Sequence, residues 1–561
     1  MKAIYKICAI SVICGFTSCN DMLDTVPQGQ FTAEQLDENS VEGLLASAYA
    51  GLEAHFFGNN EAFAGPSTNW IFDVRSDDAY KGGGGTGMEE NIHLLEVSEI
   101  TSDNVSCLNK WQNNYYAISR VHNAMLAVQQ ASGLSNADQI IGELKTLRAW
   151  YYFDLIRIFN RIPYFIEGED VNTKTNDEYS REEIFSFIKR DLQEAIEVLP
   201  AKKSDEGRIT RTTAQAIHAK VSAFTSSWEE VKTYADAVIQ SGQYSLFQNF
   251  GDLSKVDKNN GSESIFALQC STANTNAHIN WSNLLNCTVS DGNLYGNGDD
   301  FFYGSQNLVN AFRTDANGLP LLDGSFNKVN VTTGYAGNVD PRLDYTVGRI
   351  GMPWRGYTYT EGWCRAKDVY GEFSNKKGWP EPGIGFEGWP WGCSSLNFMF
   401  IRYADILLLK AEALIETATG SNAATDNGLV EARNLINQVR QRAIDTANDV
   451  NYQPMDLDPF EANYLVGLYP TAGDGNLAWT KEYARMALRM ERRLELALEG
   501  NRWFDLVRWG NDYLISTMNK YMTEEANLRT YYKDRSVSAS EIFLPVPLAE
   551  IDNSNGLYKQ Y

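Results

Sequence analysis

The stretch that decides the fold is ERRLELALEGNRWFDLVRWG, residues 491–510. Glu491, Glu495 and Glu499 stand four residues apart, which places them on one face of a helix. Arginines surround them at positions 492, 493, 502 and 508. Because a guanidinium group pairs with a carboxylate in a defined geometry, this pattern predicts a buried network of ion pairs between packed helices.

Most of the remaining chain has helical periodicity. In residues 137–159, apolar side chains recur at three- and four-residue steps from Ile140 to Ile158, so they share one buried face. Ser180 precedes Arg181-Glu182-Glu183 as a capping box, and Asn136 precedes another helix start. The predicted helices are 41–53, 111–130, 137–159, 181–198, 212–224, 228–241, 401–417, 428–443, 481–498 and 502–508. The fold class is therefore mainly α, with antiparallel helix pairs that resemble tetratricopeptide repeats.

Two segments interrupt the helices. Residues 69–86 contain three aspartates and four consecutive glycines at 82–85, which predicts a polar, flexible loop. From 248 to about 395 the chain has short apolar runs, many Gly, Asn and Pro residues, and six of the 13 tryptophans. Long irregular segments in a compact protein usually bind something.

The amino terminus has the features of an export signal. Lys2 and Lys6 precede an apolar run over 7–16, which is shorter than the roughly 20 residues of a membrane-spanning helix. Thr17-Ser18-Cys19 ends the run and resembles a bacterial lipobox, although Phe16 stands where leucine is usual. We therefore expect residues 1–18 to be a signal peptide, Cys19 to be lipidated, and residues 19–40 to be a tether.

Composition excludes several classes of function. The formal net charge of −24 repels nucleic-acid phosphates and anionic lipids. Aromatic residues make up 12% of the chain, which suits either a ring-rich core or neutral polar ligands. The cysteines that remain after cleavage of the signal form no CxxC pair. A disulfide such as Cys270 to Cys287 is permitted, but the favoured interpretation is that all of these cysteines are free thiols packed in the core as small apolar residues.

The sequence also argues against catalysis. The five histidines form no HExxH motif, there is no GxSxG elbow, and the glycine run lacks the Lys-Ser/Thr of a phosphate loop. Glu491 and Glu495 are candidates for the carboxylate pair of a glycosidase, but nearby arginines would keep both ionised, whereas the acid needs a raised pKa. No cofactor or metal site is predicted; a structural calcium at Asp299 and Asp300 is left open.

Five motifs in order carry a resemblance to one family. They are DMLD at 21–24, LRAWYYF at 147–153, IRYADILLLKAEA at 401–413, the 491–510 stretch, and FLPVP at 543–547 followed by Glu550, Ile551 and Asn555. With them the chain resembles the SusD/RagB outer-membrane lipoproteins of Bacteroidota. The resemblance implies an α-α superhelix with an irregular ligand-binding half. It also implies a SusC-like TonB-dependent transporter as partner. The lipoprotein would close over this transporter as a lid, enclosing an oligosaccharide or a peptide without catalysing a reaction.

The resulting layout has a helical part over 41–247 with a binding loop near 69–86, an irregular aromatic-rich ligand-binding part over 248–400, and a helical part over 401–561. Sugars bind through stacked rings and polar side chains, so we expect both types at the ligand site. The predicted contacts are Asp73, Arg75, Asp77, Asp78, Tyr80, Trp281, Tyr295, Arg349, Trp354 and Tyr370. A surface glycan-binding protein anchored in the outer membrane is the expected function; a peptide-binding protein and a surface glycosidase are the alternatives.

Overall fold

The computed structural model describes residues 38–53, 65–202, 205–273, 279–289, 298–381, 383–384, 393–448 and 463–561. The signal peptide, Cys19, most of the tether and Tyr295 lie outside these ranges. The fold is mainly α, as the periodicity predicted. None of the described helices has the length and apolar character that crossing a membrane requires.

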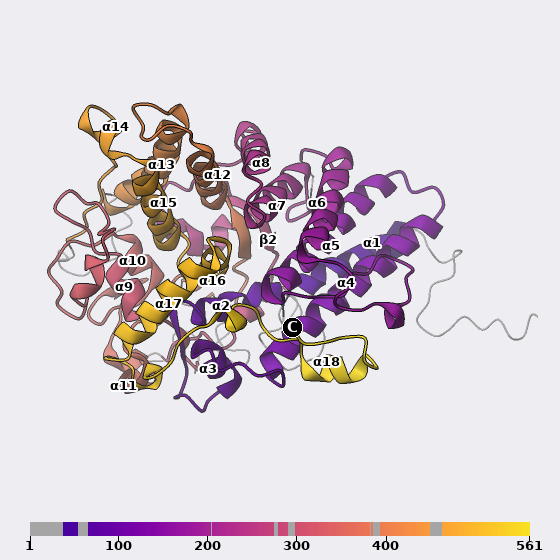
Figure 1. Cartoon of the computed structure of the whole chain (residues 1–561), viewed down its shortest axis with the longest axis horizontal. Helices are drawn as coiled ribbons and strands as arrows, with labels where there is room; N and C mark the ends of the chain where they lie inside the picture. The colour runs from indigo at the N-terminus through magenta and orange to yellow at the C-terminus, as the bar shows by residue number, and fades with distance from the viewer. Residues whose placement is uncertain are drawn as a thin grey trace, which may run out of the picture.

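The N-terminal half is a row of antiparallel helices (Figure 1). Each of α4 to α7 packs on the next helix along the chain, and α1 packs on α4. The face predicted for α5 is buried, with Ile140, Leu144 and Leu155 each 0% exposed. The helices are α1 (Glu38–Tyr49), α4 (Val105–Gln130), α5 (Ala137–Ile158), α6 (Arg181–Val198), α7 (Arg211–Phe224) and α8 (Trp228–Gln240).

The C-terminal helices continue this row. Helix α12 packs on α8, α13 and α15, and α16 packs on α17. They are α12 (Tyr403–Thr417), α13 (Asn427–Asn448), α14 (Asp474–Ala478), α15 (Lys481–Glu495), α16 (Arg502–Arg508), α17 (Asn511–Glu525) and α18 (Leu548–Asn553). Helix α15 ends before the predicted 498 because Leu498 and Gly500 have positive φ angles of 57° and 75°. Helix α17 was not predicted.

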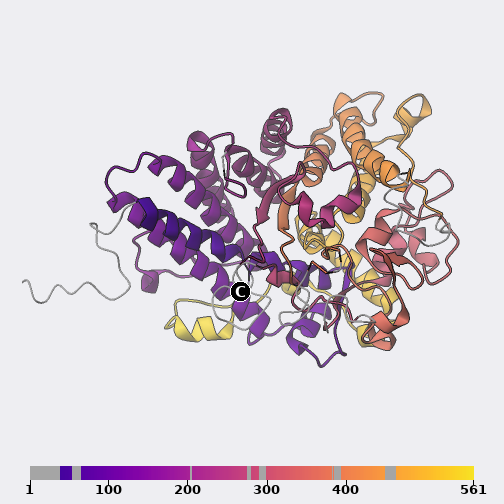
Figure 2. The ribbon, with the colours of Figure 1, turned by 180° about the vertical axis from the view of Figure 1, so that it is seen from behind.

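The strands and the remaining short α-helices occur in two places along the chain, between α1 and α4 and between α8 and α12. Those between α8 and α12 lie mainly beside the C-terminal helices (Figure 2). Three antiparallel pairs form: β1 (Ala79–Gly82) with β3 (Phe301–Gly304), β2 (Ser264–Leu268) with β6 (Phe398–Arg402), and β4 (Pro353–Trp354) with β5 (Tyr357–Thr358). The short helices are α2 (Trp70–Val74), α3 (Glu90–Glu96), α9 (Gln306–Ala311), α10 (Arg342–Thr346) and α11 (Lys367–Tyr370).

Two local predictions have different outcomes. Ser180 forms the predicted capping box with Glu183, which satisfies free N–H groups at the start of α6. Helix α5 begins after Asn136 as expected, but the Asn136 side chain makes no capping hydrogen bond.

The prediction that residues 69–86 form a flexible loop is wrong for most of the segment. It contains α2 and β1, and residues 69–83 are buried. Gly82 has φ +80°, and a Cβ there would stand 2.6 Å from the Asp300 carbonyl oxygen, so β1 needs glycine to end against β3. Two of the four glycines, Gly82 and Gly83, are therefore packed positions, whereas Gly84 is exposed and Gly85 is partly exposed.

A candidate ligand-binding pocket

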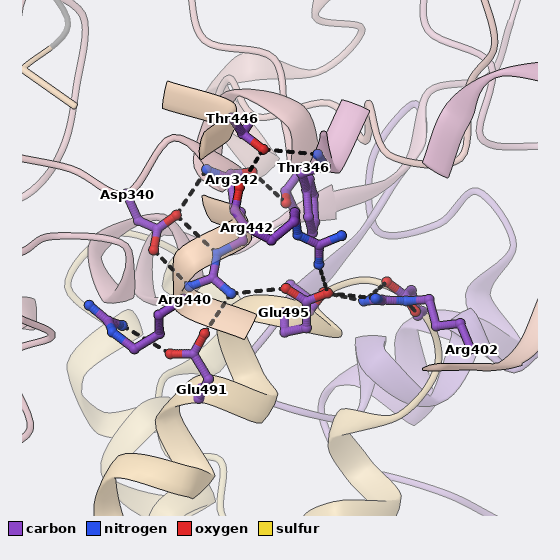
Figure 3. A network of polar contacts seen from close by, with 12 residues as sticks. Asp340, Arg342, Thr346, Arg402, Arg440, Arg442, Thr446, Glu491 and Glu495 are labelled. Atoms are coloured by element: carbon purple, nitrogen blue, oxygen red, sulfur yellow. Dashed lines mark hydrogen bonds and ion pairs between the residues drawn. The ribbon is translucent and has the colours of Figure 1, made fainter. Parts of the chain in front are cut away.

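Glu491 and Glu495 of the 491–510 stretch form the predicted buried network (Figure 3). Arg342 Nη1 donates to Glu491 Oε1 at 2.7 Å and to Glu495 Oε2 at 2.9 Å. Arg440 also binds Glu491, at 2.9 Å. Burial alone would raise the pKa of Glu495, but the charges of Arg442, Arg402 and Arg342 hold this pKa well below its usual value. A carboxylate held ionised in this way is unsuited to be the acid of a glycosidase.

The pairing inside this network differs from the prediction. The glutamates bind arginines from distant segments, because the neighbouring arginines on the chain point to other partners. Arg492 binds Asp405 and Asp505, and Arg508 binds Glu412. The remaining two, Arg493 and Arg502, bind the 69–86 segment.

The predicted contacts of the 69–86 segment hold that segment onto α15 and α16. Arg502 donates to both oxygens of Asp77 at 2.7 and 2.9 Å, and Arg493 Nε donates to Asp78 at 2.7 Å. Asp73 accepts hydrogen bonds from the Gly500 and Arg502 amides. Burial alone would raise the pKa of Asp77, but Arg493 and Arg502 lower it to about 2.

Arg75 and Tyr80 complete this attachment. The Arg75 guanidinium lies 4.0 Å from the centre of the Trp503 ring, and the Tyr80 hydroxyl donates to Glu525 at 2.5 Å. All five side chains of this predicted group are at most 3% exposed. These five side chains lie at an internal contact, because each charge has a protein partner or is packed on a ring. Asp77, with Arg493 and Arg502, also lines a cavity of about 300 Å³.

The predicted residues of the irregular part that the structure describes, all but Tyr295, are at most 6% exposed. Trp354 is 0% exposed, and its ring stacks on that of Tyr359 with the ring centres 5.4 Å apart. Arg349 binds Asp344 through two nitrogens at 2.7 and 2.6 Å. Trp281 is 6% exposed and Tyr370 is 0% exposed. The structure does not bring these residues to one surface, and their packing favours a role in the core.

A different set of residues, both amide and apolar, lines a pocket beside β6. It encloses about 80 Å³ and includes three aromatic rings. Trp70 Nε1 donates to the Ser282 carbonyl at 3.1 Å, and its ring lies 5.0 Å from Phe302. We call it the amide pocket after its asparagines. Its lining includes Trp70, Asn280, Ser282, Asn283, Asn286, Phe302, Asn375, Lys377, Asn397, Phe398, Arg402 and Glu499.

The asparagines present polar edges whose positions are held by the backbone. Asn280 Nδ2 donates to the Leu396 carbonyl at 3.0 Å, and Asn283 Nδ2 donates to the Gly378 carbonyl at 2.7 Å. Asn286 is 3% exposed, and its Oδ1 has no hydrogen-bond partner among the described residues. A buried acceptor without a partner costs about 1–3 kcal/mol, which a ligand hydroxyl would recover by donating to it.

Each charged residue of the amide pocket has a partner of opposite charge, and Arg402 also pairs with Glu495 behind the wall. Glu499 binds Lys377 at 2.5 Å and Arg402 at 2.9 Å. Burial lowers the pKa of Lys377, and Glu499 opposes that effect. Leu498 and Glu499 of the 491–510 stretch form part of the wall. With its charges paired, the pocket offers amides and rings, which suit an uncharged polyhydroxy ligand.

Sequence reasoning missed these asparagines because it selected rings first. The signal was present: Asn280, Asn283 and Asn286 recur every three residues at the start of the irregular part. The described ranges contain no group of three or more His, Cys, Asp or Glu residues able to hold a metal, and the described cysteines, including Cys270 and Cys287, are free thiols.

Comparisons with known proteins agree with this architecture. Residues 262–561 match the model of the SusD family, and residues 23–225 match a model described as "Starch-binding associating with outer membrane". A SusD-like protein of Bacteroides ovatus is 25% identical over 540 residues, which are 91% of this chain and 83% of that protein.

Solved structures share the fold. Surface glycan-binding protein A from Bacteroides fluxus is 21% identical, with a TM-score of 0.66 over 93% of this chain and 99% of that one. Surface glycan-binding protein A from Bacteroides thetaiotaomicron, solved in complex with laminarihexaose, is 18% identical, with a TM-score of 0.65 over 93% of this chain and 99% of that one.

Proposed function

The chain belongs to the SusD family, and from this premise we propose that it is a surface lipoprotein of the outer membrane that captures neutral oligosaccharides. It then passes them to a SusC-like TonB-dependent transporter. The capture step is binding alone, with no bond broken in the glycan.

The amide pocket is the observation that carries the proposal. Its rings and fixed amides match the apolar faces and hydroxyls of a sugar, and its charges are mutually paired. Because about 80 Å³ is well below the roughly 300–1,000 Å³ of pockets that enclose a whole ligand, the pocket would take one end of an oligosaccharide. The laminarihexaose bound by a relative with the same fold supports the ligand class.

Two sequence features support the location and the partner. The lipobox-like Thr17-Ser18-Cys19 would place the lipid at the start of the mature chain, and one matching family model is described as associating with the outer membrane. The transporter is proposed from the resemblance of the motifs to the SusD/RagB lipoproteins. Mild detergent extraction of the native membrane should therefore recover this protein together with a large β-barrel protein, and recovery as a lone monomer would count against delivery.

Calorimetric titration with neutral hexaoses, laminarihexaose first, tests capture. We expect saturable binding and no new reducing ends. Asn286→Ala should weaken binding by about twofold to tenfold, the value of one hydrogen bond of about 0.5–1.5 kcal/mol. The exposed Asn511→Ala is the matched control and should leave affinity unchanged.

The same titration separates the alternatives. Binding of peptides with no response to any hexaose would replace the glycan with a peptide as ligand. Release of reducing ends by the pure protein, abolished in Glu491→Gln, would replace binding with hydrolysis.

A further inference from the structure

A second cavity, of about 470 Å³, lies in the N-terminal helical part. One wall is a single face of α4. The spacing of three and four residues places these side chains on that face: Gln112, Tyr115, Tyr116, Ser119 and His122. The other lining residues include the C-terminal segment 550–558, which comprises the end of α18 and the five residues after it. We call this cavity the α4 pocket; it shares no residue with the amide pocket.

Hydrogen bonds hold α4 and this C-terminal segment together. Gln112 Nε2 donates to Glu550 Oε1 at 2.8 Å across the cavity. Beyond it, Asn176 Nδ2 donates to the Lys559 carbonyl at 2.8 Å, and the Lys559 amide donates to Asn176 Oδ1 at 3.0 Å. The C-terminal segment is therefore fixed in place, and the α4 pocket is formed before any ligand arrives, which lowers the entropic cost of binding.

Aromatic rings make up the base of the α4 pocket. The Trp111 ring lies 5.2 Å from that of Tyr115 and 6.1 Å from that of Tyr558, and Tyr115 lies 6.0 Å from Phe165. Tyr116 stands at the rim and is 48% exposed. Trp111 is 2% exposed and Phe165 is 6% exposed, so these two rings pack behind the lining. The partly exposed Tyr115 and Tyr558 and the exposed Tyr116 offer flat apolar faces on which a sugar ring can stack.

The polar groups around these rings are almost all uncharged. No lysine or arginine occurs among the described lining residues, and the carboxylate of Glu550 already binds Gln112. Burial, assisted by the charge of Arg148, lowers the pKa of His122 to about 4, so its imidazole is neutral at physiological pH. Its buried Nε2 has no hydrogen-bond partner among the described residues.

This combination selects the class of ligand. An anionic ligand would find no cation, and a cationic one would find a single carboxylate that already has a partner. A neutral polyhydroxy ligand finds ring faces together with amide, hydroxyl and imidazole groups, and the volume lies within the roughly 300–1,000 Å³ typical of small-molecule sites.

We propose that the α4 pocket is a second binding site for neutral oligosaccharides, separate from the amide pocket. The proposal rests on the proposed function, because it adds a site for the same class of ligand. Two sites on one chain would hold a long polysaccharide at two points, which raises its effective affinity above that of either site alone.

The experiment titrates the whole mature protein and three variants with laminarihexaose, maltohexaose and cellohexaose, and with an uncharged hexapeptide as a comparison. Tyr116→Ala removes the exposed ring of the α4 pocket, and Asn286→Ala alters the amide pocket. Tyr357→Ala is the matched control, because Tyr357 is 46% exposed and lines neither pocket. Equal thermal unfolding of Tyr116→Ala and Tyr357→Ala confirms that neither change disturbs the fold.

We expect two binding events for at least one hexaose. Tyr116→Ala should weaken one of them by about tenfold, the loss of one stacking contact, and Asn286→Ala should weaken only the other. A Tyr116-sensitive event that persists in Asn286→Ala supports the second site even if the amide pocket proves inactive.

Other results overturn the inference. If Tyr116→Ala binds every hexaose like Tyr357→Ala, the α4 pocket is not a glycan site, while the proposed function stands. If Tyr116→Ala affects only the hexapeptide, the assigned ligand class is wrong. If the unmodified protein binds no hexaose, the proposed function fails and the second site fails with it.

Discussion

Glu495 offers the sharpest test of the buried network. It is 0% exposed and accepts hydrogen bonds from Arg342 at 2.9 Å, from Arg402 at 2.5 Å and from Arg442. Glu495→Gln keeps the shape of the side chain and removes its charge. Breaking a buried ion pair by neutralising one partner typically costs about 3–5 kcal/mol, because the other charge stays buried without compensation.

The cost should stay within that range even though three arginines are involved, since each keeps another carboxylate. These are Asp340 and Glu491 for Arg342, Glu263 and Glu499 for Arg402, and Glu263 for Arg442. We therefore expect Glu495→Gln to lower the free energy of unfolding by about 3–5 kcal/mol, a large share of the roughly 5–15 kcal/mol that stabilises a typical protein.

The effect should depend on pH with a defined sign. In the unfolded chain a glutamate has a pKa of about 4.3, and in the folded protein the pKa of Glu495 is well below its usual value. The stability from this carboxylate is therefore fully present above about pH 4.3 and is lost as the pH falls through the folded-state pKa. The difference between the unmodified protein and Glu495→Gln should be full at about pH 7 and should shrink in acid.

Urea denaturation followed by tryptophan fluorescence measures this difference. The control is Glu416→Gln, because Glu416 binds Arg485 at 2.6 and 2.7 Å, but both side chains are partly exposed to water, 21% for Glu416 and 30% for Arg485. Solvent screening weakens such a pair relative to a fully buried one. A loss in Glu495→Gln no larger than in Glu416→Gln would refute the assignment of a stabilising role to the buried network.

Three further predictions follow from the packing and the termini. Trp354→Ala should lower the free energy of unfolding by about 3–5 kcal/mol in urea denaturation while hexaose affinity in the folded protein stays unchanged, because Trp354 is a core residue. Cys19→Ala should abolish acyl labelling and release the protein from membranes on fractionation; continued labelling would exclude Cys19 as the lipid site. Burial raises the pKa of Glu525 to about 7, so the folded state keeps a proton that the unfolded state releases near pH 4.3, and stability falls as pH rises from about 4 to about 7. Glu525→Gln should flatten this fall in denaturation curves measured across that interval, and an unchanged slope would contradict the assignment.

Local sequence patterns predicted the helices well, because each helix is formed by residues that are close together in the chain. The face of α5 and the capping box at Ser180 involve spacings of three and four residues, which periodicity reads directly. The partners of Glu491 could not be read in this way. Arg342 and Arg440 lie 149 and 51 residues away, and only tertiary packing decides which of the many arginines reach this carboxylate.

The candidate site was harder to predict because burial cannot be read from residue type. Trp354 and Asp77 have the chemistry of sugar contacts, yet the first packs within a cluster of rings and the second binds Arg502. Asn283 and Asn286 were overlooked, since asparagine in an irregular segment is usually a turn residue. The function class followed from motifs in a defined order, which requires no knowledge of which side chains are exposed.

The attachment of the 69–86 segment to α16 has a consequence for biogenesis. Asp77 and Arg502 are 425 residues apart, and Asp73 and Gly500 are 427 apart, so these contacts form only after nearly the whole chain has been made. The N-terminal helix pairs can assemble locally, but Asp73, Asp77 and Asp78 lack these partners until residues 493–502 have been synthesised. A chain truncated before residue 491 would therefore carry these aspartates without the arginines and amides that hold the segment in place.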